Sequence, residues 1–171
     1  DCVICTSGMA ACTLVYLTYL KAGDRLVIFH DVYGANYKVS LILERLGVEV
    51  AWLDADQPGA LAEAVTENTA MIFCETPSNP LCKVVDIAEM RRHADRAGAL
   101  LVVDNTFATP HHQKPLALGA DFVIHSATKG LGGHNDLMAG AIAATKARYE
   151  DLWFTRQAIG TTLDAYSASL L

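Results

Sequence analysis

The sequence lacks the features that mark several large classes of proteins. No G-x-G-x-x-G or G-x-x-x-x-G-K-[ST] string occurs, so no motif supports nucleotide binding. Lysine and arginine total 13 against 19 acidic residues and form no cluster, and the net charge of −6 argues against a nucleic-acid surface. The longest apolar-rich segment, residues 9–20, is too short to cross a bilayer, and no signal peptide is visible. We therefore expect neither a nucleic-acid partner nor a membrane partner.

Metal-ligand and disulfide patterns are also scarce. The five cysteines are an odd number without a second C-x-x-C pair, and Cys2-Val3-Ile4-Cys5 lies in a strand-like segment. His111 and His112 are adjacent, so their side chains point different ways and form a poor metal site without another ligand. We expect no metal, and the cysteine usage fits a reducing cytoplasm.

The chain of 171 residues is 52% apolar, which is enough for one globular core. Short apolar runs alternate with segments of helical periodicity, and this alternation predicts an α/β fold with a mostly parallel sheet flanked by helices. The predicted strands are 3–5, 25–29, 49–53, 70–74, 100–103, 122–125 and 138–144. The predicted helices are 9–20, 36–46, a short one within 54–65, 86–97, 146–159 and 163–171, with a loop at 109–113.

Chemistry-bearing side chains follow the strand 122–125. Ser126, Thr128 and Lys129 leave its end within one turn, where ligands bind in open α/β sheets. The hydroxyls can bind a phosphate, and a desolvated lysine can act as a nucleophilic amine. The alternative is that the hydroxyls cap a turn and the lysine is a surface charge.

A second strand, 100–103, ends in Asp104. An aspartate there can cap a loop, bind a metal or pair with a cationic ring nitrogen. Enzymes that use pyridoxal phosphate need a lysine for the Schiff base and an acidic partner for the pyridinium nitrogen, and Asp104 with Lys129 offers both.

Two further segments allow a binding and a structural interpretation. Thr6 or Ser7 is a candidate N-cap, so the backbone of Gly8 and Met9 can hold a phosphate at a helix N-terminus or simply begin a helix. The two prolines of the run 75–80 fix a rigid loop that presents Asn79, as a ligand or as a turn residue bonded to its own backbone.

Five strings closely resemble the Cys/Met-metabolism (trans-sulfuration) family of pyridoxal-phosphate enzymes, and they occur in the family's order over nearly the whole chain. They are residues 6–11, 31–34, 75–80, 103–107 and 125–129. The family includes cystathionine γ-synthase, cystathionine γ-lyase, methionine γ-lyase and O-acylhomoserine sulfhydrylase. The resemblance implies the large cofactor-binding domain of fold-type I enzymes, which is aspartate aminotransferase-like.

The resemblance also implies roles for single residues. Lys129 is the Schiff-base lysine and moves protons, Asp104 keeps the ring nitrogen protonated, and Tyr33 stacks on the ring and assists proton transfer. Asn79 reaches the cofactor's 3′-oxygen or the substrate carboxylate. The remaining cofactor contacts are Gly8, Met9, Ser126 and Thr128 at the phosphate and Thr106 near the ring.

The implied activity is γ-elimination or γ-replacement on sulfur amino acids or activated homoserine esters, in a cytoplasmic homotetramer built as a dimer of dimers. Three positions depart from common family patterns: Ala35, which weakens methionine γ-lyase in particular, Gly130 and Asn135. The family's N-terminal arm and C-terminal small domain would lie outside 1–171, so we expect a central part of the large domain that is inactive alone. The alternative is a non-catalytic remnant that binds pyridoxal phosphate or a partner.

Overall fold

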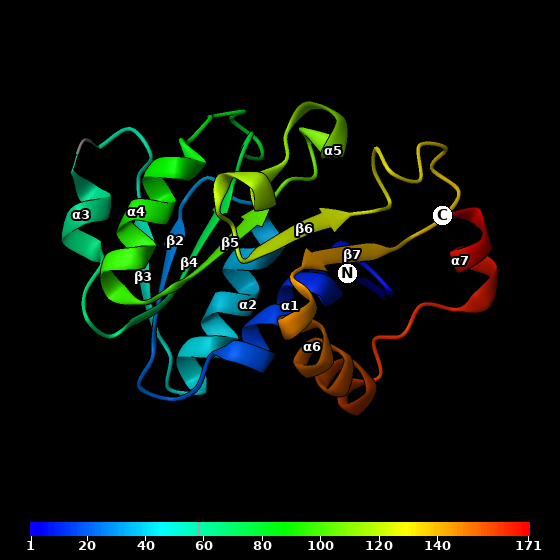
Figure 1. Ribbon diagram of the computed structural model, residues 1–171, viewed down its shortest axis with the longest axis horizontal. Coiled ribbons are helices and arrows are strands. Elements are labelled where there is room, and N and C mark those ends of the chain that lie inside the picture. The colour runs from blue at the N-terminus through cyan, green and yellow to red at the C-terminus, as the bar shows by residue number, and fades with distance from the viewer. Residues whose placement is uncertain (58) are drawn as a thin grey trace.

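The computed structural model describes residues 1–57 and 59–171, and within them one sheet of seven strands carries the fold (Figure 1). The sheet order is β1-β7-β6-β5-β4-β2-β3. The four neighbouring pairs from β6 to β3 are parallel, whereas β7 runs antiparallel to both β6 and β1. The strands are β1 (Cys2–Cys5), β2 (Arg25–Phe29), β3 (Glu49–Leu53), β4 (Thr69–Glu75), β5 (Leu100–Asp104), β6 (Phe122–Ser126) and β7 (Gly140–Ala144). The predicted mostly parallel α/β fold is confirmed.

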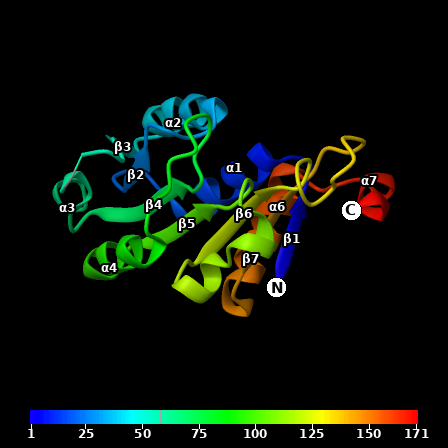
Figure 2. The ribbon, with the colours of Figure 1, turned by 90° about the horizontal axis from the view of Figure 1, so that it is seen from above.

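Helices cover both faces of the sheet, as Figure 2 shows with α2 on one side and α4 on the other. Alternate strand residues divide between two cores because neighbouring side chains on a strand point to opposite faces. Met71 and Phe73 of β4 pack under α1, whereas Ile72 and Cys74 pack against α4. The helices are α1 (Gly8–Tyr19), α2 (Gly34–Arg45), α3 (Ala60–Ala64), α4 (Ile87–Ala97), α5 (Thr109–His112), α6 (Lys146–Ile159) and α7 (Ala165–Leu170), with a 3-10 turn at Pro115–Leu118.

Capping residues explain where the helices begin and end. The Ser7 hydroxyl accepts from the Ala10 N–H at 3.0 Å, which makes Ser7 the N-cap of α1. Asp86 caps α4 in the same way, and Gly98 ends it in the left-handed region at a φ of 67°. No helix in the described part of the chain combines the length and the apolarity that a membrane span needs.

Several sequence predictions about local structure are wrong, among them the starts of strand 138–144, which begins at Gly140, and of helix 163–171, which begins at Ala165. The predicted loop 109–113 contains the short helix α5, because Pro110 is compatible with the first turn of a helix. Helix α2 starts at Gly34 rather than at residue 36, since the Asn36 N–H already donates to the Tyr33 carbonyl. Pro58, within the predicted segment 54–65, lies outside the described residues.

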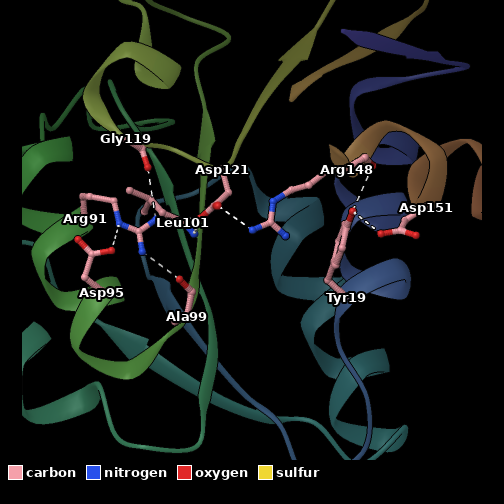
Figure 3. A network of polar contacts seen from close by, with 9 residues as sticks. All are labelled: Tyr19, Arg91, Asp95, Ala99, Leu101, Gly119, Asp121, Arg148 and Asp151. Carbon is pink, nitrogen blue, oxygen red and sulfur yellow. Dashed lines mark hydrogen bonds and ion pairs between the residues drawn. The ribbon is translucent and has the colours of Figure 1, made fainter. Parts of the chain in front are cut away.

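An ionic network holds the helices to the amino ends of β5 and β6 (Figure 3). The Asp121 carboxylate accepts from Arg91 of α4 and Arg148 of α6, each at 2.9 Å, and from the Leu101 N–H at 2.8 Å. Tyr19 of α1 donates to the Arg148 carbonyl at 3.2 Å. Asp121 therefore joins helices on the two faces of the sheet at the end opposite to the predicted site.

Candidate active site

A cavity of about 350 Å³ opens at the carboxyl ends of β4, β5 and β6. All nine residues predicted from the sequence as site residues line it, so the fold gathers five distant segments at one place. They are Gly8, Met9, Tyr33, Asn79, Asp104, Thr106, Ser126, Thr128 and Lys129.

The N-terminus of α1 forms one wall of the cavity. The N–H groups of Gly8 and Met9 have no acceptor among the described residues, because the first amides of a helix lack an intrahelical partner. Twelve aligned peptide dipoles add a partial positive charge at this end of the helix. Two free amides at such a terminus are suited to an anion, in particular a phosphate.

Ser126 lies directly against this helix terminus. A Cβ added to Gly8 would come within 2.7 Å of the Ser126 Cβ and 3.0 Å of its Oγ, so only glycine permits the approach. The Ser126 hydroxyl has no hydrogen-bond partner in the described part of the chain. It is therefore free to donate to a ligand that the two amides bind.

The Thr128 hydroxyl is already used by the protein backbone. It donates to the Ala139 carbonyl at 3.2 Å and accepts from the Ala139 N–H at 3.0 Å. Thr128 lines the cavity, but its only hydroxyl proton is committed to the turn that leads into β7. The turn-capping interpretation thus describes Thr128, whereas it does not describe Ser126.

Asp104 forms the floor of the cavity and is only 8% exposed. Burial raises the pKa of its carboxyl, and the Thr106 hydroxyl and N–H, at 2.5 and 3.0 Å from Oδ1, act in the opposite direction. Thr106 is itself held because its oxygen accepts from the Ser126 N–H at 2.8 Å. Among residues 1–57 and 59–171 no lysine or arginine forms an ion pair with Asp104.

Lys129 follows β6 in a tight turn in which its N–H donates to the Ser126 carbonyl at 3.0 Å. The Lys129 side chain lines the cavity but is exposed to solvent. The described residues therefore do not bury Lys129, in contrast to the desolvated lysine considered from the sequence. No carboxylate of the described residues pairs with its ammonium group. An amine in this position can reach a ligand bound between α1 and Asp104.

Tyr33 and Asn79 complete the opposite wall. Tyr33 is 50% exposed at the start of α2, and its ring makes no stacking contact with another described ring. The loop of Asn79 is closed by Ser78, whose N–H donates to the Lys83 carbonyl and whose carbonyl accepts from the Cys82 N–H, each at 2.9 Å. The Asn79 amide has no partner among the described residues, which disfavours the interpretation that it bonds its own backbone.

Five cavity residues were not predicted as site residues: Ser7, Cys12, Glu75, Phe107 and Met138. A signal existed for Glu75, because it ends the strand next to the Asp104 strand. Cys12 lies one helical turn after Gly8, and that spacing places it on the same face of α1.

Among the described residues no group of three or more His, Cys, Asp or Glu side chains is arranged to hold a metal ion. Cys5 is buried and Cys2 is exposed, and both are free thiols.

A lysine and a buried carboxyl face one cavity at the carboxyl edge of a mostly parallel sheet, where α/β folds bind their ligands, and these two groups are the ones that a pyridoxal-phosphate site needs. The family described as Cys/Met metabolism PLP-dependent enzyme matches residues 1–171, and the chain belongs to this family. Pyridoxal 5′-phosphate is the cofactor of the family.

Individual relatives agree with this assignment. Cystathionine gamma-lyase of Bacillus subtilis is 45% identical over 97% of this chain and 44% of its own length. Cystathionine beta-lyase MetC of Staphylococcus haemolyticus is 44% identical over 95% of this chain and 42% of its own length. The crystal structure of cystathionine gamma synthase from Xanthomonas oryzae pv. oryzae, in complex with aminoacrylate and cysteine, superimposes with a TM-score of 0.95 at 37% identity, covering 99% of this chain and 44% of that one. The chain thus spans less than half the length of these relatives.

The residues present fit pyridoxal phosphate. The buried Asp104 carboxyl lacks a cation among the described residues, and a protonated pyridine ring supplies one. The free amides of Gly8 and Met9 and the free Ser126 hydroxyl suit the phosphate, and the exposed Lys129 amine suits the aldehyde.

Proposed function

We propose that this protein catalyses γ-elimination or γ-replacement on sulfur amino acids or activated homoserine esters, with pyridoxal phosphate as cofactor. One observation carries the proposal: Lys129, Asp104 and the free amides of α1 meet at a single cavity of about 350 Å³. Relatives named as a cystathionine gamma-lyase and a cystathionine gamma synthase support the choice of substrate.

Each residue has a defined task in this proposal. Lys129 attaches the cofactor and then carries protons between the substrate's α and β carbons. Asp104, oriented by Thr106, keeps a proton on the ring nitrogen, and this contact is stronger in a buried site than in water. When bound, pyridoxal phosphate supplies an electron sink for substrate carbanions.

The remaining residues bind and orient. Gly8, Met9 and Ser126 hold the phosphate, while Thr128 shapes the turn beside it. Tyr33 stacks on the ring and assists proton transfer, and Asn79 contacts the 3′-oxygen or the substrate carboxylate.

A β-elimination is a second candidate reaction, because the relative from Staphylococcus haemolyticus is named a cystathionine beta-lyase. The two eliminations cleave cystathionine on different sides of its sulfur, so their products differ. γ-Elimination consumes one water and releases cysteine, ammonia and 2-oxobutanoate, whereas β-elimination consumes one water and releases homocysteine, ammonia and pyruvate.

The wider setting follows from the same reasoning. We infer that residues 1–171 are the central part of a large cofactor-binding domain, since they span under half of their relatives. We further propose a cytoplasmic homotetramer, supported by five free cysteines and by the exposed apolar side chains Tyr37, Leu41 and Ile42 on α2. Light scattering on the longest natural form of the protein tests the assembly.

The decisive experiment locates the cofactor. The longest natural form of the protein is incubated with pyridoxal phosphate, reduced with borohydride and digested, and the modified lysine is identified by mass spectrometry. We expect modification at Lys129, its loss in Lys129→Ala, and an unchanged result in the control Lys21→Ala, which removes an exposed lysine from the turn after α1. A folded protein that is not modified would overturn the enzyme proposal in favour of a non-catalytic remnant.

Substrate specificity is then measured on the loaded protein. Cystathionine, methionine and O-acylhomoserines are supplied in turn, and the oxo acid and thiol products are quantified. We expect 2-oxobutanoate or γ-replacement products, whereas pyruvate alone would assign β-elimination.

A further inference from the structure

Glu75 is a buried acid of the cavity to which neither the motifs nor the proposed mechanism gives a role. It ends β4, is 5% exposed and lies opposite Asp104 in the register of β4 and β5. Paired residues on adjacent strands share a face of the sheet, so both carboxyls face α1 and the cavity. Its Oε2 accepts a hydrogen bond of 2.7 Å from the backbone N–H of Tyr33.

This hydrogen bond fixes the segment that carries the Tyr33 ring. The Tyr33 carbonyl accepts from the Asn36 N–H at 2.8 Å in the first turn of α2, and the Tyr33 N–H is held by Glu75. Because the half-exposed ring stacks on no other described ring, its position depends on this backbone. Glu75 is the side chain that binds the Tyr33 backbone directly, by accepting a hydrogen bond from its N–H.

A second contact joins the same two segments. Lys83, in the loop after β4, forms an ion pair of 2.7 Å with Asp31, two residues before Tyr33. Lys83 also pairs with Asp54 and Asp56. The loop that presents Asn79 and the loop that presents Tyr33 are therefore held together at both ends.

We propose that Glu75 is a positioning residue: through its hydrogen bond with the Tyr33 N–H it sets the Tyr33 ring over the cofactor cavity. This inference rests on the proposed function for the role of Tyr33, but the Glu75–Tyr33 contact is testable without cofactor.

The surroundings of Glu75 favour its neutral form. Burial and the neighbouring Asp104 raise the pKa of Glu75 to about 8, while the Tyr33 N–H acts in the opposite direction. The titratable groups near it are Asp104 on β5, Cys74 on β4, and Cys12 and Tyr16 on α1, none of them cationic. At neutral pH the carboxyl keeps its proton and still accepts from Tyr33. A cationic ring bound at Asp104 would stabilise the ionised form of Glu75 and lower its pKa.

The first test uses the cofactor-free protein. The longest natural form is labelled with ¹⁵N-tyrosine, and Tyr33→Phe identifies the Tyr33 amide. We expect a pH-dependent shift of this amide in the wild type, and we expect it to vanish in Glu75→Gln, which keeps the acceptor oxygen but cannot ionise. In Glu75→Ala, hydrogen exchange at the Tyr33 amide should be at least tenfold faster.

Two further variants separate a local contact from a general effect. Asp104→Asn removes the neighbouring negative charge, so the pH inflection of the Tyr33 amide should move to lower pH. Glu63→Gln, at an exposed glutamate of α3, should change nothing. An inflection that persists in Glu75→Gln, or an unchanged exchange rate in a folded Glu75→Ala, would overturn the inference.

The second test uses the loaded protein. If the wild type attaches cofactor at Lys129, Glu75→Ala should lower kcat/KM at least tenfold, and Glu75→Gln should restore most of it at neutral pH. Equal kcat/KM in Glu75→Ala and the wild type would sink the positioning role while leaving the proposed function intact. A wild type that fails to load would sink the proposed function, and the amide measurements would still decide whether Glu75 holds Tyr33.

Discussion

Replacing Gly140 by alanine tests whether the α1 terminus and the sheet approach as closely as the structure shows. A Cβ at residue 140 would lie 2.0 Å from the Ser7 carbonyl oxygen and 3.0 Å from the Gly8 nitrogen. These are backbone atoms, so no side-chain rotation relieves the overlap. Restoring a 3.0 Å contact requires the two backbones to separate by about 1 Å.

The expected cost combines two terms. Forcing an extra methyl group into a packed region costs about 3 kcal/mol when only backbone can move. The displaced Ser7 also loses its cap on α1, which adds about 1 kcal/mol. With a urea m-value of about 2 kcal/mol/M, the sum of about 4 kcal/mol lowers the unfolding midpoint by about 2 M.

The same shift should weaken phosphate binding, because it moves the amides of Gly8 and Met9 away from Ser126. Loss of one hydrogen bond to a charged group corresponds to about a tenfold weaker affinity. We expect this loss for pyridoxal phosphate but not for pyridoxal, which lacks the phosphate, as measured by equilibrium dialysis on the longest natural form of the protein.

Gly34→Ala is the matched control. A Cβ at Gly34 would meet no atom within 4 Å, and its φ lies outside the left-handed region, so stability should change by less than about 0.5 kcal/mol. If Gly140→Ala unfolds at the same urea concentration as Gly34→Ala and binds both ligands as the wild type does, the close approach at Ser7 is wrong.

Three further predictions concern stability and reactivity. Asp121→Asn removes a carboxylate shared by two arginines and should lower the free energy of unfolding, measured by urea denaturation, by about 2–3 kcal/mol. A change below about 0.5 kcal/mol would show that the network in Figure 3 does not stabilise the fold. Burial and Asp104 raise the pKa of Glu75 from 4.5 to about 8, so the folded state keeps its proton to a higher pH than the unfolded state does. The Glu75 contribution to the free energy of unfolding should therefore decrease as the pH rises from about 4.5 to about 8. Glu75→Gln should remove this pH dependence, and an unaltered dependence would contradict the assignment. In the native protein a thiol reagent should modify the exposed Cys2 and Cys82 quickly. Cys5 and Cys74, which are buried and do not line the cavity, should react only after unfolding, and their fast reaction would contradict the core packing.

Hydrophobic periodicity and capping residues made most helices and strands predictable. Helix α6 has the predicted bounds, because Thr145 and the left-handed Gly160 bracket an uninterrupted helical segment. The directions of β1 and β7 were not predictable, since periodicity reports which residues face a core but not how a strand runs. Helix α5 was missed because histidine and proline in a short segment are equally typical of a loop.

The candidate site was predictable where residues follow a buried strand, since all carboxyl ends of parallel strands meet at one edge. The hydrogen-bond partners of single hydroxyl groups could not be predicted. Ser126 and Thr128 look alike in the sequence, yet Thr128 is bound to Ala139, a residue eleven positions later. Glu75 was overlooked because an acid after a strand is also typical of a capped loop.

The antiparallel direction of β7 forms the part of the site that could not be predicted from the sequence. Because β7 runs antiparallel, it begins at the edge where β6 ends, and Gly140 lies in register between Ser126 and Cys5. The chain leaves Cys5 at that same edge and passes over Gly140 into α1, so the free amides of Gly8 and Met9 come to rest against Ser126. If β7 ran parallel to β6, its last residues would lie at this edge, and Gly140, its first residue, would lie at the opposite edge of the sheet. The antiparallel edge and the absence of a side chain at Gly140 are therefore both required for the anion-binding corner.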